Sequence, residues 1–208
     1  MGDPAVLTET ITVIGTGSAE AAPNLLVATF GAELRADSVT EALDGAVRAM
    51  ADVIAKLRAG GVSDLDLNTG SASIRSMLDE DGDVTGYTAN QRLTARLRNL
   101  PVAGALVSEA VAAGGDAARL YGLAFALSDT RLVDEWARVQ AWQDARAKAG
   151  QLASLAGRTL GPVLRMRETG SGPVPMMHAV SLSMSSMPLE PGTETVRVSI
   201  EVEWAFLP

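Results

Sequence analysis

The sequence predicts an α+β fold in which two to three helices pack on one face of a mainly antiparallel sheet. Three observations lead to this class. Residues 193–206 alternate between apolar and polar side chains, as a half-buried strand does. Residues 38–58 carry apolar side chains at steps of three and four, which predicts an amphipathic helix. Arg92, Arg96 and Arg98 share one face of a predicted strand, so that face of the sheet contacts water.

The composition is that of a globular protein and excludes several classes of function. The chain has 208 residues, 47% hydrophobic and 20% charged, which suits one well-buried domain. It has no cysteine, which excludes disulfides, thiolate metal sites and a cysteine nucleophile. The net charge is -8 and no basic stripe with interleaved aromatic residues occurs, so no nucleic acid partner is expected. No apolar run approaches the roughly 20 residues of a transmembrane segment.

The first half of the chain predicts two strands and a helix. Residues 11–14 form a short apolar strand, and residues 24–34 form a second strand with alternating apolar side chains. Ser38 and Glu41 have the spacing of a capping box, so a helix begins there, and Gly60-Gly61 ends it. Its predicted buried stripe consists of Val39, Leu43, Ala46, Val47, Met50, Ile54 and Leu57.

The rest of the chain continues in the same alternation of strands and helices. Helices are predicted from Pro101 to the glycines at 114–115, and from Thr130 to Ala156. The predicted inward face of the second of these is Leu132, Trp136, Ala137, Ala141, Ala145, Ala149, Leu152 and Ala156. Strands are predicted over residues 65–77, 84–100, 120–129, 161–168 and 193–206. The order helix, Ala-Gly-Gly, strand occurs twice, at 59–61 and 113–115, which indicates a βα pseudo-repeat.

An apolar strand that leads into Gly15-Thr16-Gly17 is also how a dinucleotide-binding turn begins. A Rossmann fingerprint needs a third glycine three residues later, where this chain has Glu20, and it needs a helix that meets the pyrophosphate. Here Pro23 and Asn24 lead into a second strand instead. The sequence therefore argues against a nucleotide site, and we expect the two glycines to permit a bend or bulge between two strands.

Two further segments contain side chains that can act as metal ligands. The acidic run at 79–83 has its glycine in the wrong place for an EF-hand, so an Asp-Gly hairpin tip is expected. The Gly-, Pro-, Ser- and Met-rich segment at 169–192 is expected to be a long loop. It contains soft ligands that suit Cu(I), but an adaptable contact surface is the favoured explanation of these side chains. These candidate metal ligands are Met176, Met177, His178, Met184 and Met187.

Catalytic signals are not visible in the sequence. His178 is the only histidine, and no Gly-x-Ser-x-Gly elbow supplies a nucleophile for it. We therefore expect a protein that is not an enzyme and has no cofactor and no catalytic residue. A hydrolase that uses scattered carboxylates is the least favoured alternative.

The motifs resemble, in their order, those of the SIMPL family, a family of unassigned function named for a protein that associates with a Pelle-like kinase. The matching segments are ITVIGTGSAEAAPN, GGVSDLDLNTGSASI, GYTANQRLTARLRNL, GLAFALSDT, ARAKAGQLASLAG with LGPVLRM, and PLEPGTETVRVSIEVEWAF. The resemblance covers nearly the whole chain and implies an α+β fold without established catalytic residues or a cofactor. Many bacterial relatives look like periplasmic or surface proteins, and some are oligomeric. The residues that match the family pattern are Gly15, Gly17, Pro23, Gly86, Tyr87 and Asp129.

Turn geometry and helix caps would explain these matching residues without any chemistry. Tyr87 is expected to be an aromatic residue at a sheet edge, and the alternative is that its hydroxyl lies at a pocket or interface.

We therefore expect one SIMPL-like domain over residues 1–208, with a mobile loop at about 170–192. Its expected function is that of a non-catalytic interaction or scaffold protein that self-assembles as a homo-oligomer and can bind a protein partner. The loop and the hairpin near Gly82 are the expected contacts. The alternative function is a small-ligand or copper-binding protein that uses the Met- and His-rich loop.

The expected location depends on the first ten residues, MGDPAVLTET. They contain no basic region, apolar core or cleavage site, so no secretion signal is visible. The chain as written is expected in the cytoplasm. The alternative is the periplasm or cell envelope, if a signal has been removed and a start methionine added.

Overall fold

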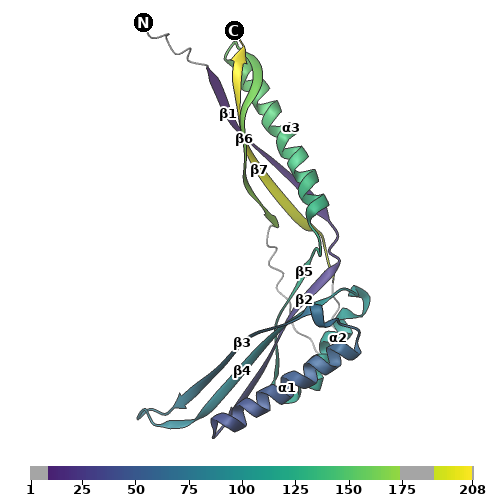
Figure 1. Cartoon of the computed structure of the whole chain (residues 1–208), viewed down its shortest axis with the longest axis vertical. Coiled ribbons are helices and arrows are strands. Elements are labelled where there is room, and N and C mark those ends of the chain that lie inside the picture. Colours follow the sequence, from purple (N-terminus) through teal and green to yellow (C-terminus); the bar gives the residue numbers. More distant parts are fainter. Residues whose placement is uncertain (1–8, 174–189, 208) are drawn as a thin grey trace. The chain divides into compact units, whose positions relative to one another are not determined.

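A computed structural model describes residues 9–173 and 190–207 of the chain. Within these residues it contains three α-helices and seven strands in two antiparallel sheets, which confirms the predicted α+β class. The chain divides into two compact units, each with one sheet (Figure 1). We call them the three-stranded unit and the four-stranded unit. The single domain expected over residues 1–208 stays a prediction.

The three-stranded unit is built from segments near both ends of the chain. Its elements are β1 (Thr10–Ala21), α3 (Arg131–Leu155), β6 (Thr159–Pro173) and β7 (Glu194–Leu207). The strands lie in the order β1-β7-β6. β1 pairs with β7 without interruption, from Thr10 opposite Ala205 to Ala21 opposite Glu194. The helix α3 runs along one face of this sheet (Figure 1).

Gly15 and Gly17 lie in the middle of β1, so the expected bend or bulge at these glycines is wrong. They point to the same face of the sheet because side chains alternate along a strand. A Cβ atom on Gly15 would overlap with the carbonyl oxygen of Ala141, and one on Gly17 would overlap with that of Ala137. Both glycines are therefore needed so that the backbone of α3 can lie directly against the strand.

The buried face of α3 consists of small residues only. Ala137, Ala141, Ala145, Ala149 and Ala153 recur at every fourth position and are almost fully buried. The predicted inward positions Leu132, Trp136 and Leu152 are instead 72%, 67% and 46% exposed, and Ala156 is also exposed. The close approach of helix and strand explains this result, because a large side chain cannot fit between the two backbones.

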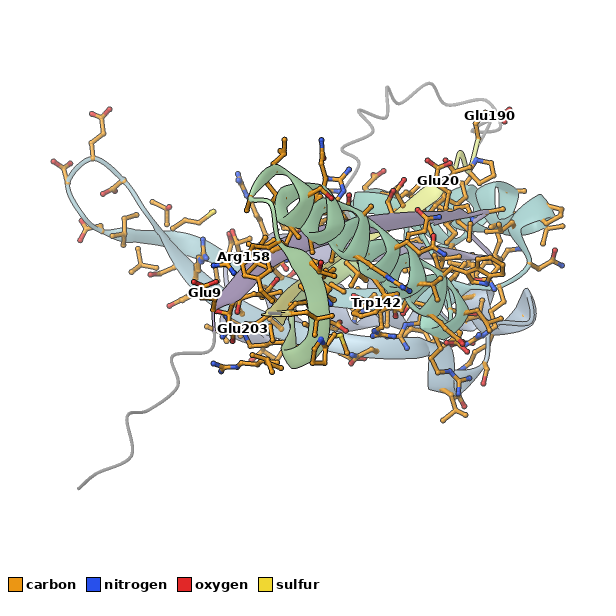
Figure 2. All side chains as sticks on the ribbon, turned by 90° about the horizontal axis from the view of Figure 1, so that it is seen from above. Glu9, Glu20, Trp142, Arg158, Glu190 and Glu203 are labelled. Carbon is orange, nitrogen blue, oxygen red and sulfur yellow. The ribbon has the colours of Figure 1, made fainter. Side chains whose placement is uncertain are left out.

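An aromatic contact and an ion pair add to the packing of the three-stranded unit. Trp142 of α3 packs against Trp204 of β7, with ring centroids 6.0 Å apart. Glu9 precedes β1 and forms an ion pair with Arg158, and the two labelled side chains lie close together in Figure 2. β6 continues to Pro173, so residues 169–173 belong to a strand rather than to the predicted loop.

The four-stranded unit has the element order βαββαβ. Its elements are β2 (Leu25–Ala36), α1 (Val39–Ala59), η1 (Asp64–Asp66), β3 (Leu67–Leu78), β4 (Val84–Leu97), α2 (Leu100–Ala113), η2 (Gly115–Ala117) and β5 (Ala118–Ala126). The strand order β3-β4-β2-β5 is that of a ferredoxin-like split βαβ arrangement. Each helix is followed by two glycines, a short 3-10 turn and a strand, as the predicted pseudo-repeat requires.

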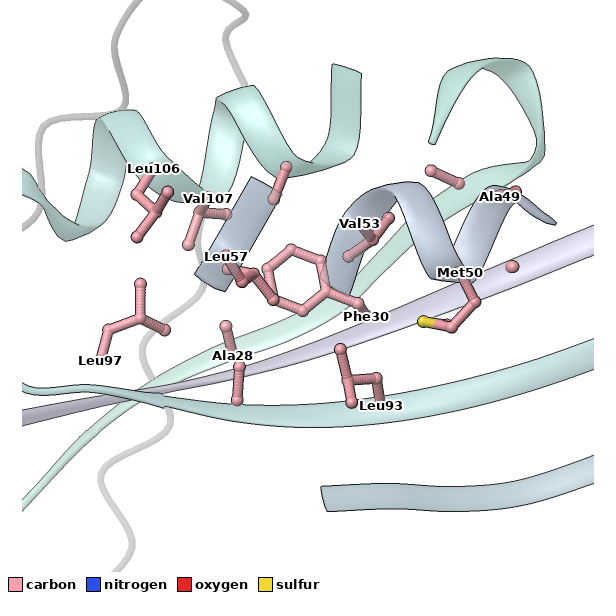
Figure 3. Close-up of a cluster of buried hydrophobic side chains, with 14 of the residues drawn as sticks. Ala28, Phe30, Ala49, Met50, Val53, Leu57, Leu93, Leu97, Leu106 and Val107 are labelled. Carbon is pink, nitrogen blue, oxygen red and sulfur yellow. The ribbon is translucent and has the colours of Figure 1, made fainter. Parts of the chain in front are cut away.

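The core of this unit lies between its helices and one face of the sheet. Phe30 of β2 and Leu93 of β4 are fully buried beneath Val53 and Leu57 of α1, and Figure 3 shows these side chains together. The helix α1 packs on β2 and β4, and α2 packs on β2 and β5. β3 therefore lies at the edge that the helices leave largely uncovered.

The predicted apolar stripe of α1 is correct in part. Ala46, Met50 and Leu57 are buried as expected. Val39, Leu43 and Val47 are partly exposed instead, and the buried face includes Ala42, Ala49 and Val53. The buried face of α1 is therefore rotated from the predicted stripe toward smaller residues.

Gly17→Ala and Gly15→Ala should each lower the free energy of unfolding by about 1–3 kcal/mol, because the added methyl overlaps with the backbone of α3. Urea denaturation followed by circular dichroism measures this change.

Gly150→Ala is the matched control in the same unit. A Cβ atom on Gly150 meets nothing within 4 Å, so this helix substitution should raise the free energy of unfolding by about 0.5–1 kcal/mol. Equal stability of Gly17→Ala and the wild type would contradict the close helix–strand contact.

Candidate functional site

The candidate copper ligands belong to the Met- and His-rich segment. Met176, Met177, His178, Met184 and Met187 all lie outside the described residues. Among residues 9–173 and 190–207, no group of three or more His, Asp or Glu side chains is arranged to hold a metal ion. None of the helices in that part of the chain is both long and apolar enough to cross a membrane.

The family-pattern residues that the structure places have structural roles. The carboxylate of Asp129 accepts hydrogen bonds from the backbone N–H of Arg131 and from its side chain, so it satisfies one N–H group in the first turn of α3, whose N-cap residue is Thr130. The Arg131 side chain, and then its backbone N–H, lower the pKa of Asp129 to about 2. Tyr87 packs partly buried against the core from β4, an inner strand, so the expectation of a sheet-edge aromatic is wrong.

The predicted hairpin tip at 79–83 is confirmed. The backbone N–H groups of Asp81 and Asp83 donate to one carboxylate oxygen of Asp79, at 3.1 and 2.8 Å. Gly82 has a positive φ of 89°, which favours glycine at this position of the turn. The acidic run therefore stabilises the β3–β4 connection through its first aspartate.

The open face of the four-stranded sheet, opposite α1 and α2, carries mostly polar side chains. Cross-strand pairing places them in rows, because residues directly opposite each other share a face. One row is Ser73, Asn90 and Glu33, from β3, β4 and β2. The next row is Arg75, Thr88 and Arg35. The predicted water-facing arginines are confirmed for Arg92 and Arg96, which are exposed on this face, whereas Arg98 lies beyond the end of β4.

A β-bulge in β5 adds an aromatic residue to this face. The pairing changes from Thr29 opposite Gly122 to Phe30 opposite Leu120, which leaves Tyr121 as the extra residue. The Tyr121 ring lies against Gly31, where a Cβ atom would overlap with it. The guanidinium carbon of Arg92 is 4.6 Å from the ring centroid, and Asn90 Nδ2 donates to the Tyr121 hydroxyl at 2.7 Å.

The side chains on this open face line a polar cavity of about 320 Å³ that is partly open to solvent. It is lined by Glu33, Ser71, Ser73, Arg75, Thr88, Asn90 and Arg92. Sequence reasoning missed this cavity, because its residues come from three strands whose register was not known. The signal that could have indicated it is the polar alternation of Ser71, Ser73 and Arg75 in β3 and of Thr88, Asn90 and Arg92 in β4.

The outer edge of β3 is a second candidate surface. β3 pairs with β4 on one side and with no described strand on the other. From Asn68 to Ser76 all its residues are exposed, so neither face of this part of the strand is covered. Arg75 is the only charged residue in the strand. Long edges with few charges and no proline are able to pair with another strand.

The other edge strands carry features that oppose such pairing. At the edge of β1, the N–H of Thr16 donates to the Asp144 carboxylate at 2.8 Å, and Lys148 Nζ donates to the carbonyl of Ile14 at 3.2 Å. These two α3 side chains also form an ion pair, and Lys148 and then Thr16 lower the pKa of Asp144. β6 contains Pro162 and three irregularities of register, and β5 contains the bulge at Tyr121.

A second cavity, of about 430 Å³, lies where η1, the end of β4 and the start of α2 meet. Asp66 at its wall is 8% exposed, and both its oxygens accept hydrogen bonds of 2.8 Å from Arg98. These hydrogen bonds lower the pKa of the Asp66 carboxyl against the opposing effect of burial. The bidentate pair ties η1 to the end of β4, so we assign it a structural role.

The comparisons with known proteins identify a family. The protein-family model described as "SIMPL: Protein of unknown function (DUF541)" matches residues 11–204. This range runs through both compact units. Two relatives, from Brucella melitensis biotype 1 and Brucella abortus strain S19, are each called "26 kDa periplasmic immunogenic protein". Each is 29% identical over 212 residues, covering 92% of this chain and 82% of the relative. The resemblance seen in the sequence motifs is thereby confirmed.

Arg98→Gln should lower the free energy of unfolding at pH 7 by about 1–3 kcal/mol, because it leaves a buried carboxylate without its partner. The folded-state pKa of Asp66 is lowered, so its contribution is present above the unfolded pKa of about 3.9. It is lost as the pH falls through the folded pKa, so the difference between variant and wild type should shrink below about pH 4. Urea denaturation of both proteins at several pH values measures this difference in the free energy of unfolding.

Arg58→Gln is the control for this prediction. Arg58 and Asp64 form a neighbouring ion pair at 2.7 Å in which both side chains are mostly exposed. Its loss should change the free energy of unfolding by no more than about 0.5 kcal/mol. A difference for Arg98→Gln that does not depend on pH would contradict the assigned role of Asp66.

Proposed function

We propose, from the premise that this chain belongs to the SIMPL family, that it is a non-catalytic interaction or scaffold protein that assembles with copies of itself. The observation that carries this proposal is the outer edge of β3, which is exposed on both faces and is paired with no described strand. The hairpin that contains this strand ends near Gly82, the contact element expected from the sequence.

Addition of a strand to β3 would satisfy its free backbone groups. The regular stretch from Ala72 to Met77 pairs with β4 without a change in register, so its outer edge is straight enough to accept a partner. A second copy of β3 is a suitable partner because an antiparallel pair of identical strands forms a closed two-fold contact. Main-chain hydrogen bonds across such an edge supply affinity without any catalytic residue.

An apolar surface on α3 supports association as well. Leu132, Trp136 and Val139 are spaced at four and three residues, so they lie on one side of the helix. They are 72%, 67% and 49% exposed. Tryptophan is enriched among the residues that dominate binding energy at protein interfaces. This surface would strengthen the self-association or bind a protein partner.

The periplasm is the proposed location. Both named relatives are described as periplasmic, and they match over most of this chain and most of their own length. This supports the periplasmic alternative over the cytoplasmic expectation from the first residues. An assembling protein of the envelope is also consistent with the names of those relatives, which describe no enzyme activity.

Ile74→Lys should dissociate the assembly, because it places a charge in the middle of the β3 edge, beside the same charge on the partner strand. Ile74 is 41% exposed, so the substitution should leave the fold intact. Light scattering on a sizing column, over a concentration series, should give a discrete multimer for the wild type. The variant should move toward the mass of one chain, 21.6 kDa.

Val47→Lys on α1 is the matched control, since Val47 is 48% exposed and lies on a helix rather than an edge strand. It should leave the mass unchanged. A wild type that stays monomeric at every concentration would overturn self-assembly. A multimer that survives Ile74→Lys would overturn the β3 edge as its interface.

A further inference from the structure

The polar cavity on the open face of the four-stranded sheet has the size of a small-molecule site. Its volume of about 320 Å³ lies at the lower end of the roughly 300–1,000 Å³ found for ligand pockets. Its walls come from β2, β3 and β4, and regular pairing of these strands places every lining residue except Ser71, which lies at a change of register in β3. The cavity has no role in the core, because its lining residues project from the open face of the sheet.

The side chains that line the cavity offer more positive than negative charge. Arg75 and Arg92 contribute two guanidinium groups, and Glu33 contributes one carboxylate. Arg35 adds a further positive charge beside them, in the row of Arg75 and Thr88. No salt bridge involving these arginines is found within the described residues. A local excess of arginine in a chain of net charge -8 favours an anion at this place.

Tyr121 holds two of these side chains in position. Its ring packs on the Arg92 guanidinium, and its hydroxyl accepts a hydrogen bond of 2.7 Å from Asn90 Nδ2. The ring is in turn held against Gly31 of β2. Arg92 is therefore oriented before any ligand arrives, which reduces the entropy that binding would cost. Its N–H groups stay available for the two-pronged hydrogen bonding that suits a carboxylate or phosphate.

The remaining groups of the cavity suit hydroxyl groups of a ligand. Ser71, Ser73 and Thr88 supply hydroxyls that both donate and accept. Glu33 can accept hydrogen bonds from ligand hydroxyls, and Asn90 Nδ2 lies 3.5 Å from one of its oxygens. A bare anion would be repelled by the Glu33 carboxylate, whereas a hydroxylated anion can place its charge at the arginines and a hydroxyl at Glu33.

We propose that this cavity binds a small polyhydroxylated molecule that carries one oxyanion group, a carboxylate or a phosphate, as in a sugar acid or a sugar phosphate. The oxyanion group binds Arg75 and Arg92. The hydroxyl groups bind Glu33, Asn90 and the serines of β3. The proposal does not depend on self-assembly, because these side chains project from the face of the sheet while the proposed assembly uses the backbone at its edge.

Isothermal titration calorimetry on the full chain tests this site with four probes: D-glucuronate, D-glucose 6-phosphate, D-glucose and inorganic phosphate. The first two should bind, and whichever binds more tightly identifies the oxyanion. D-Glucose lacks the charge and should bind at least about tenfold more weakly. Inorganic phosphate lacks the sugar hydroxyl groups and should also bind more weakly than the charged sugars. Failure of both charged sugars to bind in the millimolar range would overturn the proposal.

Substitutions of single arginines test whether the charged sugar binds in this cavity. Arg75→Gln and Arg92→Gln should each weaken the binding of the charged sugar about tenfold or more. Arg48→Gln is the matched control, because Arg48 is an exposed arginine of α1, on the opposite side of the sheet. Equal weakening by all three substitutions, or by none, would overturn the assignment to this cavity.

Glu33→Gln tests the role given to the carboxylate. It should weaken the binding of the charged sugar but strengthen that of inorganic phosphate, because it removes both a hydroxyl acceptor and a repelling charge. If Glu33→Gln changed the affinities for the charged sugar and for inorganic phosphate in the same direction, the role of Glu33 as the hydroxyl-binding group would be overturned. Repeating the titration on Ile74→Lys separates the two proposals, since ligand binding should persist whether or not that variant assembles.

Discussion

The contact between the backbones of α3 and β1 is the constraint on which the three-stranded unit depends. Glycine at alternate positions of the strand and alanine at every fourth position of the helix remove the side chains that would hold the two backbones apart. The space between them then has no room for a large residue. Leu132 and Trp136 are consequently excluded from the core, so one steric constraint accounts both for the buried alanine column and for the exposed apolar surface on α3.

The four-stranded unit is stabilised in a different way, by large side chains such as Phe30, Leu93 and Met50 between two helices and a sheet. Its split βαβ topology has two helices for four strands, and both helices lie over β2 and its direct neighbours. β3 is left beyond them as a long exposed edge. The opposite face of the sheet has no helix of this unit to cover it, so its side chains are polar. The two candidate surfaces are therefore consequences of the topology.

The sequence was sufficient to predict most of the elements and the faces of some strands, but not the complete buried faces of the helices. Alternation in residues 193–206 and the cap at Ser38 are local signals, and both were confirmed. The predicted inward face of α3 was correct for Ala137, Ala141, Ala145 and Ala149 but wrong for its larger residues, because periodicity marks apolar positions without showing which size fits the partner strand. The expected bend at Gly15 and Gly17 was also wrong. These glycines make room for a helix that follows more than 100 residues later in the chain, and no local pattern shows that contact. The cavity and the bulge at Tyr121 depend on register, which no local pattern encodes.

β3 connects the two proposals, because one strand supplies different groups in different directions. Its outer N–H and C=O groups lie in the plane of the sheet, whereas Ser73 and Arg75 point to the open face and Ile74 points to the other. A strand added at this edge would extend the open face beside the cavity without displacing its lining residues. If the added strand changes the affinity for the ligand, the ligand must change the affinity for the strand by the same factor. Binding and assembly would then be linked through a single rigid element.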